Sequence, residues 1–162
     1  MADLLHVPFA PAINHEWYRS KLDDPWCWPR LLGGPSDGHL TQEECEALAS
    51  LLKLFTLGQS CFFRFSDIPF YTREGPQLFV GDLDEVAEIQ NRERLTFEYW
   101  WPMDRSWCVC SDYDLQFTIV GGPTRLVSEL LRDEVLECLE VTPDTRVDMF
   151  APMPESMDEK TW

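Results

Sequence analysis

The chain has 162 residues, which suits a single domain, and its 44% apolar and 13% aromatic residues are enough for a hydrophobic core. Its net charge of −16 is uneven: residues 1–81 carry 10 acids and 6 bases, and residues 82–162 carry 19 acids and 7 bases. The apolar content argues against global disorder. The charge argues about partners, because an acidic surface repels nucleic acid and anionic lipid and attracts cationic proteins.

The start of the chain indicates a cytoplasmic protein. No basic region followed by an apolar run opens it, so we expect no signal peptide, and no apolar stretch approaches the ~18 residues that a membrane span needs. The six cysteines lie within apolar runs, and most are expected to be reduced core residues. A disulfide framework is the alternative.

Residues 1–40 are rich in proline and predict loops, with a short helix near 13–22. Four large aromatic side chains in this segment would be costly to expose together, so we expect it to wrap around the domain. They are Trp17, Tyr18, Trp26 and Trp28.

The strongest helix signal covers residues 41–56. Thr41 and Glu44 have the spacing of a capping box, and Gly58 is a suitable stop. An apolar stripe follows at intervals of three and four residues. It consists of Cys45, Leu48, Leu51, Leu52 and Phe55.

Two short strands and a second helix are predicted next. Residues 61–66 (CFFRFS) and 77–81 (QLFVG) are apolar runs between breakers, which is typical of strands. Asp82 and Glu85 repeat the capping pattern before a short helix near 83–90.

Three further runs predict an antiparallel meander: residues 95–101, 106–110 and 115–120, joined by turns at 102–105 and 112–114. Strict alternation in the first run gives an apolar face, expected to meet a helix, made of Leu95, Phe97, Tyr99 and Trp101. Thr96, Glu98 and Trp100 then share the opposite face. In the last run Leu115, Phe117 and Ile119 share a face, and we expect Ile119 in the core.

Gly121, Gly122 and Pro123 lead into a helix predicted over 125–132, and residues 133–141 form a further short helix or strand. From Thr142 the chain is rich in proline and methionine, and we expect an extended or disordered acidic tail over 142–162. The prediction is therefore an α+β fold: one domain over residues 1–141, with an antiparallel sheet of about five strands packed against helices.

No catalytic signature or metal-ligand spacing is recognisable, so we expect no catalytic residue, metal or cofactor. Cys108 and Cys110 have acidic neighbours, which favour the unreactive thiol over a nucleophilic thiolate. No window holds more than two clustered bases, which argues against nucleic-acid binding. Glu98 lies mid-strand, where it is a general acid, a solvated strand residue or the ion-pair partner of an arginine such as Arg64.

The aromatic and acidic residues of the meander are the candidate partner-binding site. Consecutive aromatic residues point to both faces of a strand, so some of these rings should lie near the surface beside acids, where they could anchor Arg and Lys side chains. The candidates are Glu98, Tyr99, Trp100, Asp104, Asp112 and Asp114, with Tyr99 and Trp100 as anchors. The alternative is that residues 1–40 cover this face.

Residues 96–140 carry the elements WWP-x-D-R-S-W, D-Y-D-L and GG, followed by a leucine-rich helix. In these elements the chain resembles small acidic bacterial, actinobacterial-type, toxin-immunity-like proteins. The resemblance implies an immunity-like role, in which an acidic domain masks a cationic toxin.

The leading hypothesis is thus a non-enzymatic binding protein that docks on a basic protein partner. A second is a small-molecule-binding domain or carboxylate-using enzyme, with Glu98 at the base of a pocket walled by Trp17, Trp26, Trp28 and Trp101. A third is a structural acidic domain without a dedicated site.

Overall fold

The computed structural model describes residues 40–65, 77–93, 97–112, 115 and 117–145. The chain divides into two units, one of residues 36–138 and one of residues 1–35 with 139–162. Every described helix and strand belongs to the first unit. In the second, the described residues include a turn in which Thr145 N donates to Thr142 O over 2.9 Å. The helix predicted at 13–22, the N-terminal wrap and most of the tail lie outside the described residues, and the boundary at residue 141 stays a prediction.

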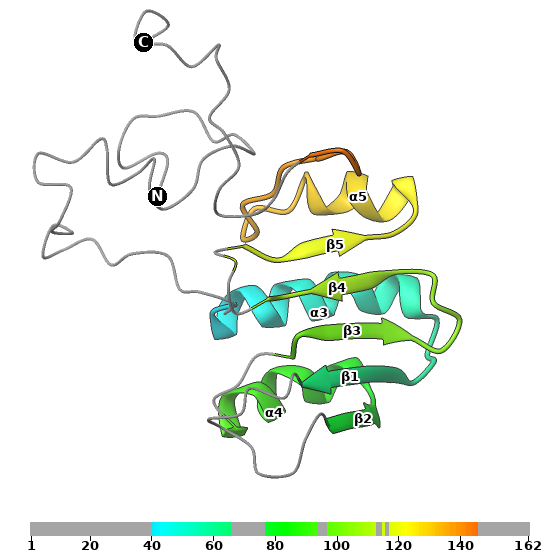
Figure 1. Cartoon of the computed structure of the whole chain (residues 1–162), viewed down its shortest axis with the longest axis vertical. Helices are drawn as coiled ribbons and strands as arrows, with labels where there is room; N and C mark the ends of the chain where they lie inside the picture. The colour runs from blue at the N-terminus through cyan, green and yellow to red at the C-terminus, as the bar shows by residue number, and fades with distance from the viewer. Residues whose placement is uncertain (1–39, 66–76, 94–96, 113–114, 116, 146–162) are drawn as a thin grey trace, which may run out of the picture. The chain divides into compact units, whose positions relative to one another are not determined.

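A five-stranded antiparallel sheet forms the centre of the larger unit, in the order β2-β1-β3-β4-β5 (Figure 1). The strands are β1 (Cys61–Phe65), β2 (Gln77–Gly81), β3 (Tyr99–Pro102), β4 (Cys108–Cys110) and β5 (Ile119–Gly121). Together with the helices this confirms the predicted α+β fold and the antiparallel meander of its C-terminal half. Strands β1 and β2 match their predicted ranges closely because breakers bound both of them.

Helix α3 (Gln42–Thr56) is the long helix predicted from the apolar stripe. Its capping box is present: Thr41 N donates to Glu44 Oε2 over 2.8 Å, and Glu44 N donates to Thr41 Oγ1 over 3.2 Å. The helix ends where Leu57 takes a left-handed conformation with φ 55°, followed by Gly58 at φ 75°. The local sequence therefore sets both ends of this helix.

The second predicted helix begins with a different geometry. A 3₁₀ turn, η1 (Leu83–Glu85), precedes α4 (Val86–Glu93), and the Asp82 side chain makes no capping hydrogen bond. The expected capping box is therefore wrong at this site. Burial of Leu83 and Val86 holds the segment in place, so packing substitutes for the cap.

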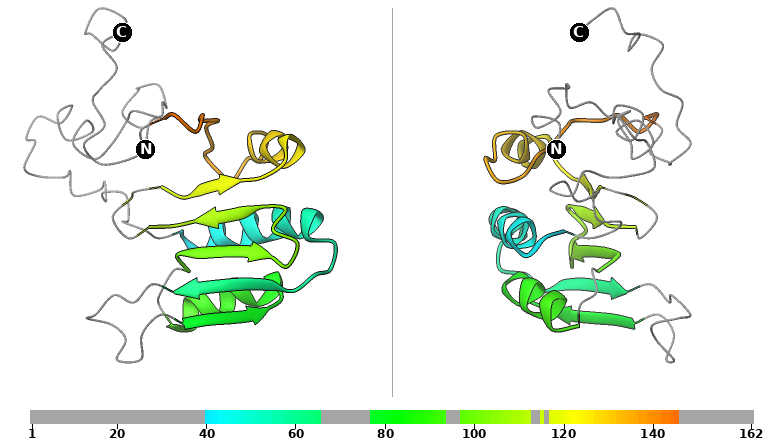
Figure 2. Two further views of the ribbon diagram at one scale, coloured as in Figure 1. Left: turned by 45° about the vertical axis from the view of Figure 1, so that its right-hand side comes forward. Right: turned by 90° about the vertical axis from the view of Figure 1, so that its left-hand side faces the viewer.

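The described helices lie on one face of the sheet. Helix α5 (Thr124–Leu130) follows β5, and the edge-on view of Figure 2 places α3, α4 and α5 on the same side of the strands. Residues 133–141, expected as a helix or strand, form neither. The opposite face of the sheet is left without a helix from the described part of the chain.

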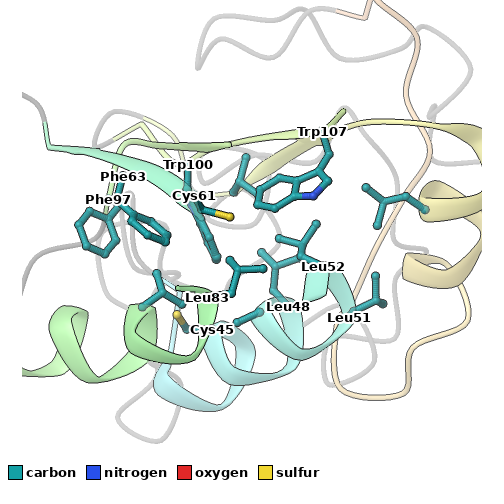
Figure 3. Packing of buried hydrophobic residues seen from close by; sticks show 14 of the residues in the cluster. Cys45, Leu48, Leu51, Leu52, Cys61, Phe63, Leu83, Phe97, Trp100 and Trp107 are labelled. Atoms are coloured by element: carbon teal, nitrogen blue, oxygen red, sulfur yellow. The ribbon is translucent and has the colours of Figure 1, made fainter. Parts of the chain in front are cut away.

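The core lies between the sheet and these helices (Figure 3). Phe97 links two rings of β1 there: its ring centroid is 5.0 Å from that of Phe63 and 4.3 Å from that of Phe65. The sixteen buried apolar residues are Cys45, Leu48, Ala49, Leu51, Leu52, Cys61, Phe63, Phe65, Leu83, Val86, Phe97, Trp100, Trp107, Val109, Leu126 and Leu130.

Trp100 is a core residue, and its expected position on the exposed face is wrong. It is 0% exposed and lies opposite Phe63 in the register, yet Phe97, three residues earlier, is also 0% exposed. Strict alternation would put residues 97 and 100 on opposite faces. The chain bends at Glu98, whose N–H donates to Arg64 O, and the extra residue there is the geometry of a β-bulge. Tyr99 and Trp101 are consequently turned away from the core.

A similar correction applies to β5. This strand begins only at Ile119, and Val120, not Ile119, packs against the core, because Val120 lies opposite the buried Val109. Ile119 pairs with Cys110 on the other face. Phe117, which precedes the strand, is 41% exposed.

Candidate functional site

The face of the sheet turned away from the helices, here named the open face, is the candidate site. Alternation and strand register assign to it Leu78, Val80, Phe62, Arg64, Tyr99, Trp101, Cys108, Cys110 and Ile119. Leu78 is 57% and Val80 60% exposed, and the other members are exposed or half-buried. A sheet of this size usually covers one face and solvates the other, but a solvated face is normally polar. An apolar exposed face is typical of an interaction surface.

An apolar row crosses the open face. Phe62 of β1 lies between Val80 of β2 and Trp101 of β3 in the register. The rings of Phe62 and Trp101 are stacked, with centroids 5.6 Å apart and planes at 19°. Cys108 of β4 continues the row beyond Trp101. The row presents a nearly flat aromatic surface, partly accessible to solvent, that could receive apolar groups or guanidinium planes of a partner.

A more polar row runs beside it. Arg64 Nη1 lies 3.9 Å from Glu98 Oε2, and the Arg64 guanidinium carbon lies 5.8 Å from the centre of the Tyr99 ring. A hydrogen bond between Tyr99 and Cys110 is the largest of the effects that raise the pKa of Tyr99 to about 12. Tyr99 is therefore a neutral phenol at physiological pH. The distance to Arg64 gives Glu98 the ion-pair role, which was one of the alternatives that the sequence left open.

The turn after β3 holds one acid in a fixed place. Asp104 Oδ2 accepts a hydrogen bond from Gln59 Nε2 over 2.9 Å, and its Oδ1 accepts one from Ser106 N over 3.0 Å. These hydrogen bonds, led by that from Gln59, lower the pKa of Asp104. Arg105 follows with φ 57°. Asp104 thus carries a permanent, exposed negative charge at one end of the open face.

The predicted partner-binding residues do not all come together. Tyr99 lies on the open face, Glu98 pairs beside it, and the acids Asp104 and Asp112 follow β3 and β4. Trp100 cannot be an anchor because its side chain is in the core. Asp114 lies outside the described residues. Sequence reasoning missed Phe62, Leu78, Val80 and Trp101 as surface residues. The mixed pattern of CFFRF, in which Phe62 and Arg64 alternate with three apolar residues, was the available signal.

A shallow depression, open to solvent, adjoins the apolar row and is lined by Trp101, Arg105, Trp107 and Cys108. Its lining is almost wholly apolar, and Glu98 is not part of it. Trp17, Trp26 and Trp28, which the small-molecule hypothesis placed around a pocket, lie outside the described residues. The depression extends the open face, and it brings together no acid–base pair.

The cysteines divide between the core and the open face. Cys45 and Cys61 are 0% exposed, and burial is the main reason that the pKa of each thiol is raised to about 11. Cys108 is exposed and Cys110 half-buried on the open face, and all five described cysteines are free thiols. The sequence expectation of core cysteines therefore holds for Cys45 and Cys61 and is wrong for Cys108.

We expect a thiol reagent to modify Cys108 before the core cysteines. In a Cys27→Ser variant near pH 8, Cys45 and Cys61 should react at least about 100-fold more slowly than Cys108, because they need both an opening of the core and a thiolate. Although the Cys108 residue is exposed, partial desolvation of its thiol by the surrounding sheet raises the pKa of Cys108, so its labelling rate should keep rising as the pH approaches 9. Peptide mass mapping over time measures the order. Equal labelling of Cys61 and Cys108 would contradict the assigned faces.

Within the described part of the chain, no group of three or more His, Cys, Asp or Glu residues is placed to hold a metal ion. Nor does any helix described here have the length and apolar character to cross a membrane. The chain matches no known family model, no curated protein and no solved structure. The function must accordingly be argued from the open face itself.

Proposed function

We propose that this chain is a non-enzymatic, acidic binding protein: an immunity-like inhibitor that masks a basic protein partner, such as a toxin domain. The observation that supports the proposal is the apolar, partly aromatic open face. Its rings, Phe62, Tyr99 and Trp101, are half-buried and are supported from behind by a packed core, so they are held in place before a partner arrives. Such preorganised aromatic residues are the usual anchors of protein interfaces.

Charge supports a basic partner. With a net charge of −16, the chain attracts cationic proteins over a distance and repels acidic ones. At the open face itself, Asp104 and Asp112 lie at the ends of β3 and β4, while Arg64 is paired with Glu98. The rings of Phe62, Tyr99 and Trp101 suit arginine and lysine side chains, which stack on aromatic rings, and the carboxylates of Glu98 and Asp112 act on Tyr99.

The test starts with the partner and ends with defined variants. The full chain is used to capture proteins from a lysate of its native cells at low and at high salt, and the captured protein is then purified. We expect a basic protein whose affinity falls with salt. Trp101→Ser should weaken its binding by about 10- to 30-fold, the loss typical of one central aromatic anchor. Leu54→Ser, at an α3 residue that is 72% exposed and not part of the open face, is the matched control and should leave the affinity unchanged.

Two further results decide the inhibitory role. Asp112→Lys together with Asp114→Lys should slow association and flatten its salt dependence, because the net charge of a binding protein mainly steers its encounter with a charged partner. Co-expression with the full chain should abolish any toxicity of the captured protein, and co-expression with the Trp101→Ser variant should not. An acidic partner, or one that binds the Trp101→Ser and Leu54→Ser variants equally well, would reject the proposal.

A further inference from the structure

Strand β2 forms one edge of the sheet. Among the described strands it pairs with β1 alone, from Cys61 opposite Gly81 to Phe65 opposite Gln77, and the sheet order ends with it. In Figures 1 and 2 no described element lies beyond β2 on its outer side. Alternate N–H and C=O groups of an edge strand point away from its neighbour and can pair with a further strand.

The side chains of β2 do nothing to prevent such pairing. Leu78, Phe79 and Val80 are 57%, 40% and 60% exposed, so three consecutive apolar residues meet solvent on both faces. Residues 77–81 include no charged residue and no proline. Natural sheets usually protect a five-residue apolar edge with a lysine, a proline, a bulge or a covering segment.

The opposite edge is protected. Strand β5 has three residues, Ile119–Gly121, and Gly122 and Pro123 follow it at once. Proline has no backbone N–H to donate to a neighbouring strand, and so short a strand offers few backbone groups for hydrogen bonds to an added strand. The sheet therefore has one closed edge and one open edge, and the open edge borders the open face through Leu78 and Val80.

Acidic residues lie at the C-terminal end of β2. Asp82, Asp84, Glu85 and Glu88 all fall in residues 82–88, which contain no Lys or Arg. The Glu85 carboxylate lies against the Gly81 backbone, with Oε2 2.7 Å from where a β-carbon would stand. Among the described residues, one ion pair involves these acids, between Lys53 Nζ and Asp84. A strand added along β2 would therefore end beside a group of carboxylates.

We propose that β2 receives an extended, basic segment of the partner protein as a sixth strand of the sheet. Backbone hydrogen bonds would hold the segment, alternate apolar side chains would lie beside Leu78 and Val80, and a basic side chain would meet Glu85 and Asp82. The basic character of the segment rests on the proposed function. A second copy of this chain fits the edge poorly, because pairing β2 with β2 would bring together two sets of these acids and two net charges of −16.

The test is hydrogen exchange of the full chain with a defined probe, a synthetic peptide of about nine residues that alternates lysine and valine. We expect alternate β2 amides to exchange at least about tenfold more slowly with the peptide bound. A matched peptide alternating glutamate and valine should give no protection. Binding of the lysine–valine peptide without protection of β2 amides, or no binding at millimolar concentration, would overturn the inference.

Matched variants separate the edge from general charge effects. Leu78→Lys with Val80→Lys should abolish the protection. Leu54→Lys with Leu57→Lys adds the same charge at Leu54 of α3 and at Leu57 just after it, which are 72% and 83% exposed, and should preserve the protection. Sedimentation tests the alternative occupant. If the chain is a dimer that dissociates only in the variant with Leu78→Lys and Val80→Lys, a second copy occupies the edge and the inference is wrong. If Trp101→Ser loses partner binding but the partner does not protect the β2 amides, the proposed function holds and the sixth-strand inference is wrong. If the partner protects the β2 amides but binds the Trp101→Ser variant normally, the sixth-strand inference holds and the proposed function of the open face is wrong.

Discussion

Replacing Trp100 with alanine is expected to destabilise the domain by about 3–5 kcal/mol, the usual cost of removing a large buried ring. The Trp100 side chain is 0% exposed, and its ring centroid lies 6.5 Å from that of Phe63. The neighbouring core is closely packed and can refill only part of the cavity. Urea unfolding followed by circular dichroism would measure the loss as a lower midpoint with an unchanged slope.

Two variants sharpen this prediction. Trp101→Ala, one residue along the same strand, should cost only about 0.5–1.5 kcal/mol, because the half-buried Trp101 ring loses chiefly its stacking on Phe62. Trp100→Phe should lose much less than Trp100→Ala, since it keeps most of the apolar volume and removes a buried indole N–H without an acceptor among the described residues. If Trp101→Ala lowered the free energy of unfolding more than Trp100→Ala, Trp101 would be the core residue, as strict alternation predicts, and the assignment of the open face would be wrong.

Leu52→Ala is expected to destabilise the domain by about 2–5 kcal/mol. Leu52 is 0% exposed in the middle of α3, where it faces the sheet within the core (Figure 3). Because α3 covers the centre of the sheet, a cavity there weakens the contact between the two layers. Thermal unfolding would report it as a fall in the midpoint temperature, by several degrees for each kcal/mol in a domain of this size.

The control for this variant lies on the same helix. Leu54→Ala removes the same atoms from a side chain that is 72% exposed, so the free energy of unfolding should change by no more than about 0.5 kcal/mol. The pair therefore separates core packing from helix propensity, which is nearly the same for the two substitutions. Comparable losses at both positions would mean that Leu54 is covered in solution, by another segment or by a second copy.

If both core predictions hold, the side chains of the open face contribute little to the free energy of unfolding of the domain. An apolar surface that stabilises the domain little is free to serve the contact proposed above. This is also why binding and stability can be measured separately here: Trp101 substitutions should affect binding, and Trp100 substitutions should affect folding.

Much of the candidate site was within reach of the sequence. The acidic charge, the meander and the aromatic run at 99–101 were all predicted, and Tyr99 with the acids Asp104 and Asp112 lies on or beside the open face. The sequence did not predict that Trp100 lies in the core while Trp101 lies on the open face. One extra residue at Glu98 reverses the face of every following side chain in the strand, and no local signal in the sequence marks it.

The α+β class, the capping and end of α3, the limits of β1 and β2, and the strong negative charge can all be read from the amino-acid sequence. These features depend on near neighbours along the chain: caps, breakers, apolar period and composition. The three-dimensional arrangement was needed to see that Trp100 enters the core, that Trp101 stacks on Phe62, that the described helices share one face, and that β2 is an edge among the described strands. These depend on strand register and on contacts between distant segments, which a single sequence does not encode locally.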